Sequence, residues 1–189
     1  MKLGTIKELS ALKEVLKDPE KSTLDPVYWV FYELTSDSWA NSTIISPGKL
    51  GEEYPKTFGH YHPEDAPDEI YHVLSGKGIL QLQKKHIENG ALVPEIVDEV
   101  YLISAKEGEE IIIKKEFGHS WSNVGKLPLM QFDDWRSGHT PDDYEPIKKT
   151  HGMAYYLIEE DGKPKALKNP NYKSVPEPKW VSADEFKSL

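Results

Sequence analysis

The chain has 189 residues, a length typical of one domain with short extensions. Hydrophobic residues make up 38% and aromatic residues 11% of it, enough for a packed core, which excludes wholesale disorder. Acidic residues exceed basic ones by 32 − 23 = 9, and Arg136 is the only arginine. A surface built to bind nucleic acid or anionic membrane normally carries a basic, arginine-bearing face. We therefore expect neither partner.

Cysteine is absent, which excludes disulfides, thiolate nucleophiles and cysteine-ligated zinc. The first sixteen residues hold no apolar run of the kind that a secretory signal needs. Nothing later approaches the roughly 18 consecutive apolar residues that span a bilayer. These features predict a soluble, cytoplasmic protein.

The first expected element is a short helix. Thr5 and Glu8 have the spacing of a capping box, and apolar residues from Leu9 to Leu16 then recur at helical intervals until Pro19. This helix would lie in an N-terminal extension covering residues 1–24.

From Asp25 onward the pattern becomes that of an all-β protein. Short segments rich in β-branched and aromatic residues alternate with turn residues, as in a sandwich or barrel. The expected strands are Val27–Leu34, Ser42–Ser46, Phe58–His62, Glu69–Leu74, Ile79–Gln83, Val97–Ile103, Glu110–Lys114, His119–Val124, Leu129–Asp133, Met153–Glu159 and Lys165–Leu167. Hairpin turns are expected at Gly76–Gly78, Asn89-Gly90 and Asp161-Gly162.

The C-terminal segment contains three prolines between Pro170 and Trp180, which predicts an irregular surface arm. Ser182 and Glu185 are spaced to cap a last short helix. No repeat or linker divides the chain. We therefore expect a single domain over residues 1–189, with a β-barrel core at 25–168 and an arm at 169–189.

The main chemical signal is the pair of histidines in the segment Thr57-Phe58-Gly59-His60-Tyr61-His62. On a strand, residues i and i+2 share a face, so His60 and His62 would present half of a metal site. Glu69 opens the next expected strand, and His119 opens a later one, so these two residues could complete the ligand set. The alternative is an ordinary cross-strand feature, which a lone His-x-His pattern more often is.

Two spaced blocks carry a resemblance to a known family. In the first, six residues separate His62 from Glu69 and six more separate Glu69 from Gly76; in the second, ten residues separate Gly108 from His119. These blocks resemble the two cupin motifs, in the longer-spaced form of the archaeal-type phosphoglucose isomerase family. Further similarity occurs at Pro47–Gly51, Thr57–His60, Glu69–Tyr71, Asp143-Tyr144, Ile158–Gly162 and Asn169-Pro170.

The resemblance implies a cupin double-stranded β-helix, a jelly-roll barrel with a short N-terminal helix and an extended C-terminal arm. It also implies one divalent metal ion per subunit, with His60, His62, Glu69 and His119 as ligands. Three imidazoles and one carboxylate leave two positions of an octahedral ion open. Fe²⁺ is the first expectation, and Mn²⁺, Ni²⁺ and Zn²⁺ are alternatives.

The same resemblance assigns substrate contacts to Thr43, Thr57, Gly59, Tyr71 and His139. Strand propensity alone could explain the two threonines, and core packing could explain Tyr71. A further aromatic contact in the first expected strand could be Tyr28 or Trp29. The chain departs from the family at Lys115–Gly118, where Glu116 replaces a substrate-contacting tyrosine.

The function implied is metal-dependent interconversion of glucose 6-phosphate and fructose 6-phosphate, as in glycolysis and gluconeogenesis, by a homodimer. Glu69 is the candidate base and Tyr71 its neighbour at the substrate. An enediol route and a direct hydride shift are both chemically open. The alternatives are a non-catalytic cupin that binds sugar phosphate or metal, an Fe²⁺ oxygenase, and an isomerase of another sugar phosphate.

Overall fold

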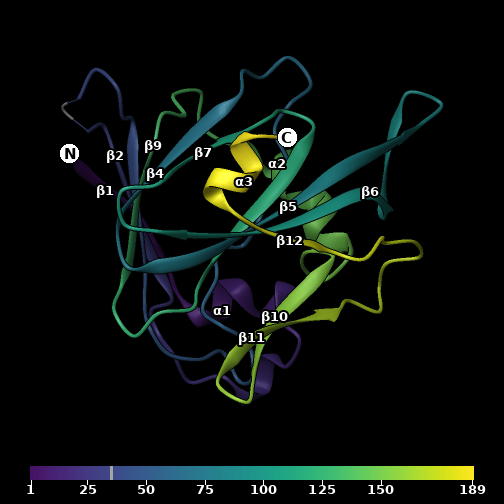
Figure 1. The fold of residues 1–189 in the computed structure, drawn as a ribbon, viewed down its shortest axis with the longest axis horizontal. Coiled ribbons are helices and arrows are strands. Elements are labelled where there is room, and N and C mark those ends of the chain that lie inside the picture. The colour runs from purple at the N-terminus through teal and green to yellow at the C-terminus, as the bar shows by residue number, and fades with distance from the viewer. Residues whose placement is uncertain (35) are drawn as a thin grey trace.

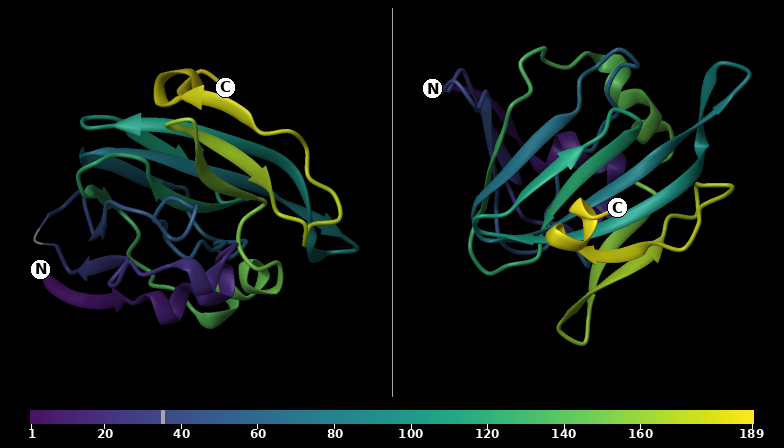
Figure 2. Two further views of the ribbon diagram at one scale, coloured as in Figure 1. Left: turned by 90° about the horizontal axis from the view of Figure 1, so that it is seen from below. Right: turned by 45° about the horizontal axis from the view of Figure 1, so that its top comes forward.

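Two β-sheets face each other, with a separate hairpin and short helices at their margins (Figures 1 and 2). The computed structural model describes residues 1–34 and 36–189. The larger sheet has the order β1-β2-β3-β9-β4-β7. Its strands are β1 (Lys2–Lys7), β2 (Tyr28–Tyr32), β3 (Asn41–Ile45), β9 (Leu129–Asp133), β4 (Glu69–Ser75) and β7 (Glu110–Ile113).

The smaller sheet has the order β12-β6-β5-β8. Its strands are β5 (Lys77–Glu88), β6 (Ala91–Lys106), β8 (Phe117–Asn123) and β12 (Lys179–Ser182). All its pairs are antiparallel except β12 with β6. Strands distant in sequence are neighbours in both sheets, as in a jelly roll, so the expected all-β jelly-roll barrel is confirmed.

The main core lies between the two sheets. Strands such as β4 and β7 alternate buried and more exposed residues, which places one face of each strand in the interior. Fully buried side chains from both sheets, among them Ile45, Val73, Leu80, Ile103 and Trp121, form this core. Their burial is the main source of stability of the barrel, since each buried aliphatic side chain contributes about 1.5–3 kcal/mol.

The turn at Gly76–Gly78 is not a hairpin, contrary to the sequence prediction. β4 belongs to the larger sheet and β5 to the smaller one, so the chain crosses between sheets at Gly76. Gly76 has a φ of 90°, and a Cβ atom there would lie 2.7 Å from the carbonyl oxygen of Pro128. The crossing therefore needs glycine for both its backbone conformation and its close contact.

Other local signals are confirmed. Asn89-Gly90 joins β5 to β6, and Asp161-Gly162 joins β10 (Tyr155–Glu160) to β11 (Lys163–Lys168). The last helix, α3 (Ala183–Lys187), begins with the expected capping box, in which Glu185 N donates to the Ser182 hydroxyl. The arm before α3 is irregular except for β12, which pairs in parallel with β6.

The N-terminal prediction is only partly right. Thr5 lies in β1, and Glu8 precedes a helix of one turn, α1 (Leu9–Leu12), without a side-chain cap. The apolar residues expected on one long helix continue instead into 3-10 turns at Lys13–Val15 and Pro19–Lys21. Leu12 and Val15 are still fully buried, so the apolar periodicity predicted the buried positions correctly, whereas the predicted helix was too long.

One helix was not expected. α2 (Pro141–Lys149) begins after Thr140, whose backbone N–H donates to Oδ2 of Asp143 at 2.8 Å. A threonine followed three residues later by an acidic residue, with proline at the first helical position, is a helix-start signal. Pro146 lies inside this segment, and because proline usually ends a helix, it argues against one here.

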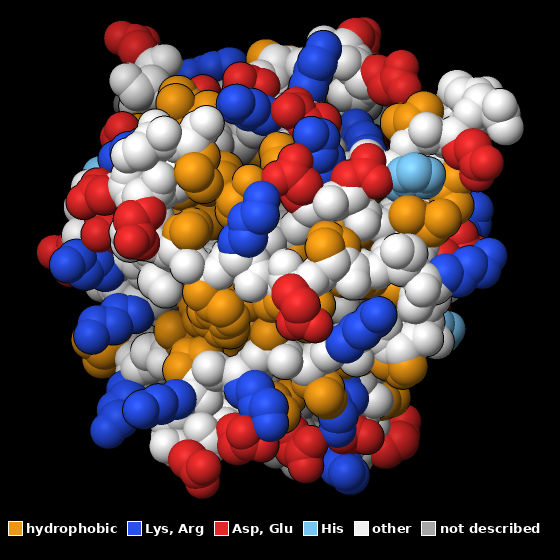
Figure 3. All heavy atoms as spheres, turned by 45° about the vertical axis from the view of Figure 1, so that its right-hand side comes forward, with side chains coloured by type: hydrophobic (Ala, Val, Ile, Leu, Met, Phe, Trp, Pro, Cys, Tyr) orange, Lys and Arg blue, Asp and Glu red, His pale blue; other side chains and the backbone are white. Residues whose placement is uncertain are grey.

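The surface mixes charges of both signs. On the face shown in Figure 3, acidic and basic side chains are interspersed, and that view of the described chain contains no continuous basic area. None of the helices in the described part of the chain has the length and apolar character that crossing a bilayer requires.

We expect Gly76→Ala to lower the free energy of unfolding by about 3 kcal/mol, because alanine there meets both an unfavourable φ and the Pro128 carbonyl. Gly90→Ala is the matched control: its φ is 77°, but nothing lies within 4 Å of a Cβ. We expect that control to cost about 1 kcal/mol. Urea denaturation of both variants measures the difference, and equal losses would contradict the role of the sheet crossing.

Candidate metal centre and substrate cavity

A cavity of about 560 Å³ opens into the barrel, lined by residues of both sheets and of the loop after β9. Three of the four expected metal ligands, His60, Glu69 and His119, are among its lining residues. All four offer ligand atoms within 4.8 Å of one another. The sequence prediction that these four side chains converge is therefore confirmed in the geometry.

The segment carrying His60 and His62 is not the regular strand that the sequence predicted. It contributes an isolated bridge in which His60 N donates to His119 O at 3.2 Å and His119 N donates to His60 O at 2.9 Å. Gly59 has a φ of 85°, and a Cβ there would lie 2.9 Å from Sδ of Met153. This conformation bends the segment out of strand geometry while the bridge holds it against β8.

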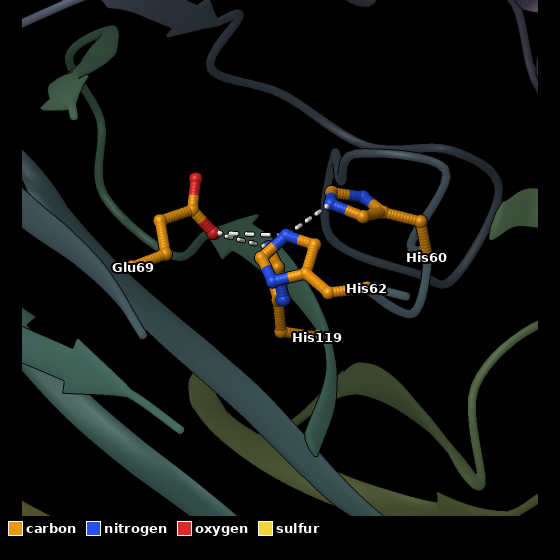
Figure 4. A group of neighbouring side chains, drawn as sticks. All are labelled: His60, His62, Glu69 and His119. Carbon is orange, nitrogen blue, oxygen red and sulfur yellow. Dashed lines mark hydrogen bonds and ion pairs between the residues drawn. The ribbon is translucent and has the colours of Figure 1, made fainter. Parts of the chain in front are cut away.

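Figure 4 shows how the four side chains converge. Nε2 of His60 lies 3.3 Å from Nε2 of His62. Oε2 of Glu69 lies 3.4 Å from Nε2 of His62 and 3.3 Å from Nε2 of His119. Glu69 and His119 come from β4 and β8, one strand of each sheet, so the cluster joins the two layers of the barrel.

Several ligand atoms of this cluster are buried and have no hydrogen-bond partner in the described part of the chain. His62, Glu69 and His119 are each at most 3% exposed. Oε2 of Glu69 and Nε2 of His119 have no hydrogen-bond partner among the described residues. Buried polar atoms without partners are costly, whereas a cation would satisfy the lone pairs of all four residues. The residues therefore fit a divalent metal ion.

Burial also sets the protonation of the cluster. It lowers the pKa of His60 and of His119 well below the ordinary imidazole range, and it lowers the pKa of His62 to about 3. Burial, followed by the charge of Asp133, raises the pKa of Glu69 well above its usual range. Imidazoles that stay neutral at pH 7 keep the lone pair that a metal needs, and a bound cation would favour the ionised carboxylate.

Aromatic rings fix the positions of the imidazoles. The indole of Trp135 stacks on His62 with ring centroids 4.1 Å apart and an interplanar angle of 6°. The ring centroid of His139 lies 4.0 Å from that of His60, and its Nδ1 is 3.7 Å from Oδ2 of Asp143. His139 therefore stands where its assignment in the sequence analysis requires, beside the cluster and on the cavity wall.

The other predicted substrate contacts also reach the cavity, whose lining includes Thr43, Thr57, Gly59 and Tyr71. Of the two aromatic candidates in β2, Tyr28 lines it, with Val30 and Tyr32 on the same face of the strand. Trp29 is not among the lining residues, as the alternation of a strand requires. The placement is shown for these residues, and their roles stay predictions.

The remaining histidines lie elsewhere. His72 alternates away from Glu69 and Tyr71 on β4, and its Nδ1 lies 3.2 Å from Oε1 of Glu110. Nδ1 of His86 lies 2.7 Å from Oδ1 of Asp98 on the β5–β6 hairpin. Glu116, which stands where the family has a tyrosine, is also not among the residues that line the cavity.

Sequence reasoning missed one whole wall of the cavity. β9 and the loop after it contribute Gln131, Asp133, Trp135 and Arg136, and α2 contributes Tyr144. The guanidinium of Arg136 donates from Nη2 to the carbonyl oxygen of Asp37 at the rim. The available signal was the alternation Leu129, Gln131, Asp133, in which polar residues occupy the inward positions of an interior strand.

A jelly-roll barrel whose cavity carries three imidazoles and one carboxylate defines a protein of the cupin class. A family model described as Glucose-6-phosphate isomerase (GPI) matches residues 10–174. The chain belongs to that family, whose members are aldose–ketose isomerases.

Curated relatives agree. The glucose-6-phosphate isomerase of Thermococcus kodakarensis is 29% identical over 177 residues, covering 90% of this chain and 82% of the relative. That of Thermococcus onnurineus is 30% identical over 180 residues, covering 89% and 87%. That of Pyrococcus furiosus is 30% identical over 156 residues, covering 79% and 75%. Among solved structures, the Drosophila melanogaster CENP-C cupin domain has a TM-score of 0.38 at 13% identity over 59% of this chain and 70% of that one.

We expect Asp133→Asn to stabilise the metal-free protein at neutral pH. Burial, followed by the charge of Asp134, raises the pKa of Asp133 to about 6, although Asn41 and the Trp135 N–H donate to the carboxylate. Because the folded-state pKa lies above the unfolded value of about 3.9, ionisation destabilises the fold by up to about 3 kcal/mol.

This destabilisation is fully present above about pH 6 and vanishes below about pH 4, where the carboxyl is protonated in both states. Urea denaturation between pH 4 and pH 8 should show the Asp133→Asn variant gaining on the parent protein as the pH rises. If the difference in free energy of unfolding between the two proteins does not change with pH, the pKa of Asp133 is not raised in the folded state.

Proposed function

We propose that this chain interconverts glucose 6-phosphate and fructose 6-phosphate in the barrel cavity, and that the reaction depends on one divalent metal ion per subunit. The observation that supports this most is the convergence of His60, His62, Glu69 and His119 beside a cavity, in a chain of the isomerase family. Three of the four side chains are buried and His60 is half-buried. Its substrate is a small sugar phosphate.

The metal ligands in this proposal are the three imidazoles and the carboxylate of the cluster. Mixed nitrogen and oxygen donors suit Fe²⁺, which we place first, and also Mn²⁺, Ni²⁺ and Zn²⁺. When bound, such an ion supplies Lewis-acid polarisation of the sugar carbonyl. The chain contributes rigid ligand positions, since both β4 and β8 are paired on two sides.

Glu69 and Tyr71 are the proposed catalytic residues. They lie two residues apart on β4, share a face and both line the cavity. In the enediol route, the Glu69 carboxylate takes the proton from C2 and returns it at C1. In the hydride-shift route, the hydrogen moves directly between these carbons and Glu69 only orients the substrate. Turnover in D₂O separates the routes, because only the enediol exposes the moving hydrogen to solvent exchange.

Tyr71 supports either route as a hydrogen-bonding group. Burial, followed by the charge of Glu69, raises its pKa well above the ordinary phenol range. The phenol therefore stays protonated at neutral pH and can donate to a sugar oxygen. Its position beside Glu69 would hold the C1–C2 end of the sugar at the cluster.

The phosphate group is proposed to bind at Thr43, Thr57 and Gly59, through hydroxyl groups and the Gly59 backbone N–H. The Thr57 hydroxyl is already oriented, since it accepts from Trp121 N at 3.1 Å and lies 3.2 Å from the Ser120 hydroxyl. Neutral donors of this kind bind phosphate without a bidentate guanidinium. His139, beside His60, would contact the other end of the sugar.

We further propose that the protein works as a cytoplasmic homodimer in glycolysis and gluconeogenesis. The supporting observations are its family membership and the absence of cysteine.

The first test is a coupled assay for glucose 6-phosphate formation on chelator-stripped protein, with Fe²⁺, Mn²⁺, Ni²⁺ or Zn²⁺ restored separately. We expect turnover only with metal, and a loss of at least about 100-fold in His119→Ala, because one of four ligands is removed. His72→Ala is the matched control, since this histidine lies on β4 but faces away from the cluster. It should keep both metal and activity.

Two outcomes would count against the proposal. If no metal restores turnover although one ion binds per subunit, the site binds metal and the substrate is a different sugar phosphate or is bound without reaction. If activity survives His119→Ala, the reaction centre lies elsewhere.

A second prediction concerns the phenol. We expect Tyr71→Phe to lower kcat by roughly 10- to 100-fold, a typical loss for one positioned hydrogen-bonding or proton-transfer group, while metal stoichiometry is unchanged. Tyr101→Phe serves as control, because Tyr101 is equally buried but its hydroxyl donates to Glu99 on β6. An unchanged kcat in Tyr71→Phe would show that Tyr71 only packs in the core and that its hydroxyl takes no part in the reaction.

A further inference from the structure

The side chain of Gln131 occupies an unusual position in the barrel. It lies in the middle of β9, where its backbone pairs with Thr43 of β3 on one side and Val73 of β4 on the other. The residue is 1% exposed, yet it lines the cavity. Two ladders of backbone hydrogen bonds therefore fix the backbone at Gln131, on a strand that forms part of the cavity wall.

Both polar atoms of this carboxamide are unpaired. Oε1 and Nε2 of Gln131 are buried and have no hydrogen-bond partner among the described residues. A buried amide without partners costs roughly 1–3 kcal/mol, so a position with only a structural role would favour an apolar side chain. This cost would be recovered if a group that enters the cavity paired with these two atoms.

Gln83 shows how the same side chain is treated when its role is structural. It is fully buried in β5, and its Nε2 donates to the hydroxyls of Tyr61 at 2.6 Å and Tyr172 at 3.0 Å. Its Oε1 accepts from Ala154 N at 2.8 Å. Every polar atom of Gln83 is satisfied by the protein, whereas none of Gln131 is.

The chemistry of an amide indicates what ligand would satisfy it. Gln131 offers two N–H donors and one carbonyl acceptor. A phosphate or a ketone accepts only, and would leave Oε1 unpaired. Hydroxyl groups both donate and accept, so two neighbouring hydroxyls on a carbon chain match the amide. Thr43 beside it on β3 and Asp133 two residues along extend this polar wall.

We propose that Gln131 is a specificity-determining residue that binds adjacent hydroxyl groups of the sugar chain. The inference rests on the proposed function for the identity of the ligand, an open-chain sugar phosphate. It makes Gln131 the contact that distinguishes a polyhydroxylated chain from other small phosphorylated molecules.

The test measures binding rather than turnover, with glucitol 6-phosphate as the probe and its 3-, 4- and 5-deoxy analogues for comparison. Isothermal titration is done on metal-loaded protein and on Gln131→Met, which keeps the volume but removes the polar atoms. We expect Gln131→Met to weaken glucitol 6-phosphate binding roughly tenfold or more. Each of the two analogues that lacks a contacted hydroxyl should show a smaller difference in affinity between parent and variant than glucitol 6-phosphate does, whereas the third analogue should show the full difference.

The matched control is Gln81→Met. Gln81 is 3% exposed and its Oε1 is also unpaired, but it lies in β5 and does not line the cavity. Removing its amide should leave the affinity for glucitol 6-phosphate unchanged.

Thermal unfolding separates a binding role of Gln131 from a structural one, because the two roles predict opposite changes in the melting temperature of the variant. Without ligand, Gln131→Met should melt at a higher temperature than the parent, because an unpaired buried amide has been replaced by an apolar group. A lower melting temperature would show that the amide is paired inside the ligand-free protein and would overturn the inference. If Gln131→Met does not fold, Gln131→Leu takes its place.

Failure of this inference is distinguishable from failure of the proposed function. Normal isomerisation by the parent protein, with unchanged probe binding in Gln131→Met, refutes only the role of Gln131. Probe binding that depends on Gln131, in a protein without isomerase activity, refutes only the reaction. Absence of probe binding to the parent protein refutes the role of Gln131 outright.

Discussion

The site depends on the pair of backbone hydrogen bonds between His60 and His119. The segment around His60 forms no regular strand of its own, so the direction of its imidazoles depends on this pairing and on the stacking of Trp135 against His62. Pairing with β8 gives it the register of a strand that is itself held by β5. This bridge, together with a second one between Lys56 and Ser122, transfers the rigidity of the smaller sheet to two ligands outside it. The cluster is completed by Glu69 of the opposite sheet.

Much of this arrangement could be predicted because its signals are local. Asn89-Gly90 and Asp161-Gly162 specify tight turns by their own backbone preferences, and Ser182 caps α3 through an atom three residues away. The four cluster residues were found by motif spacing. Their convergence still needed the fold, since three of the six ligand pairs join residues 50 or more positions apart in the sequence.

What could not be predicted depends on distant contacts. The local sequence around Gly76 predicts a hairpin, because nothing in it indicates that β4 and β5 belong to different sheets. Only the fold shows the close contact between Gly76 and Pro128. The same limit hid the β9 wall: Gln131 and Asp133 alternate correctly for a strand, but alternation alone does not tell an inward face from an outward one. Only the position of β9 between β3 and β4 makes that face the cavity.

Several buried polar atoms that lack partners in the described part of the chain share one location, the cavity. Glu69, His119 and Gln131 all present buried atoms without partners among the described residues, and all three line one cavity. Gln83 in β5 is fully paired. A ligand that satisfies such atoms binds the folded state alone, so it stabilises the fold by an amount that grows with its free concentration relative to its Kd. The polar interior of this barrel is therefore less stable when empty, and that cost is the direct consequence of having its hydrogen-bonding groups already in place for a ligand.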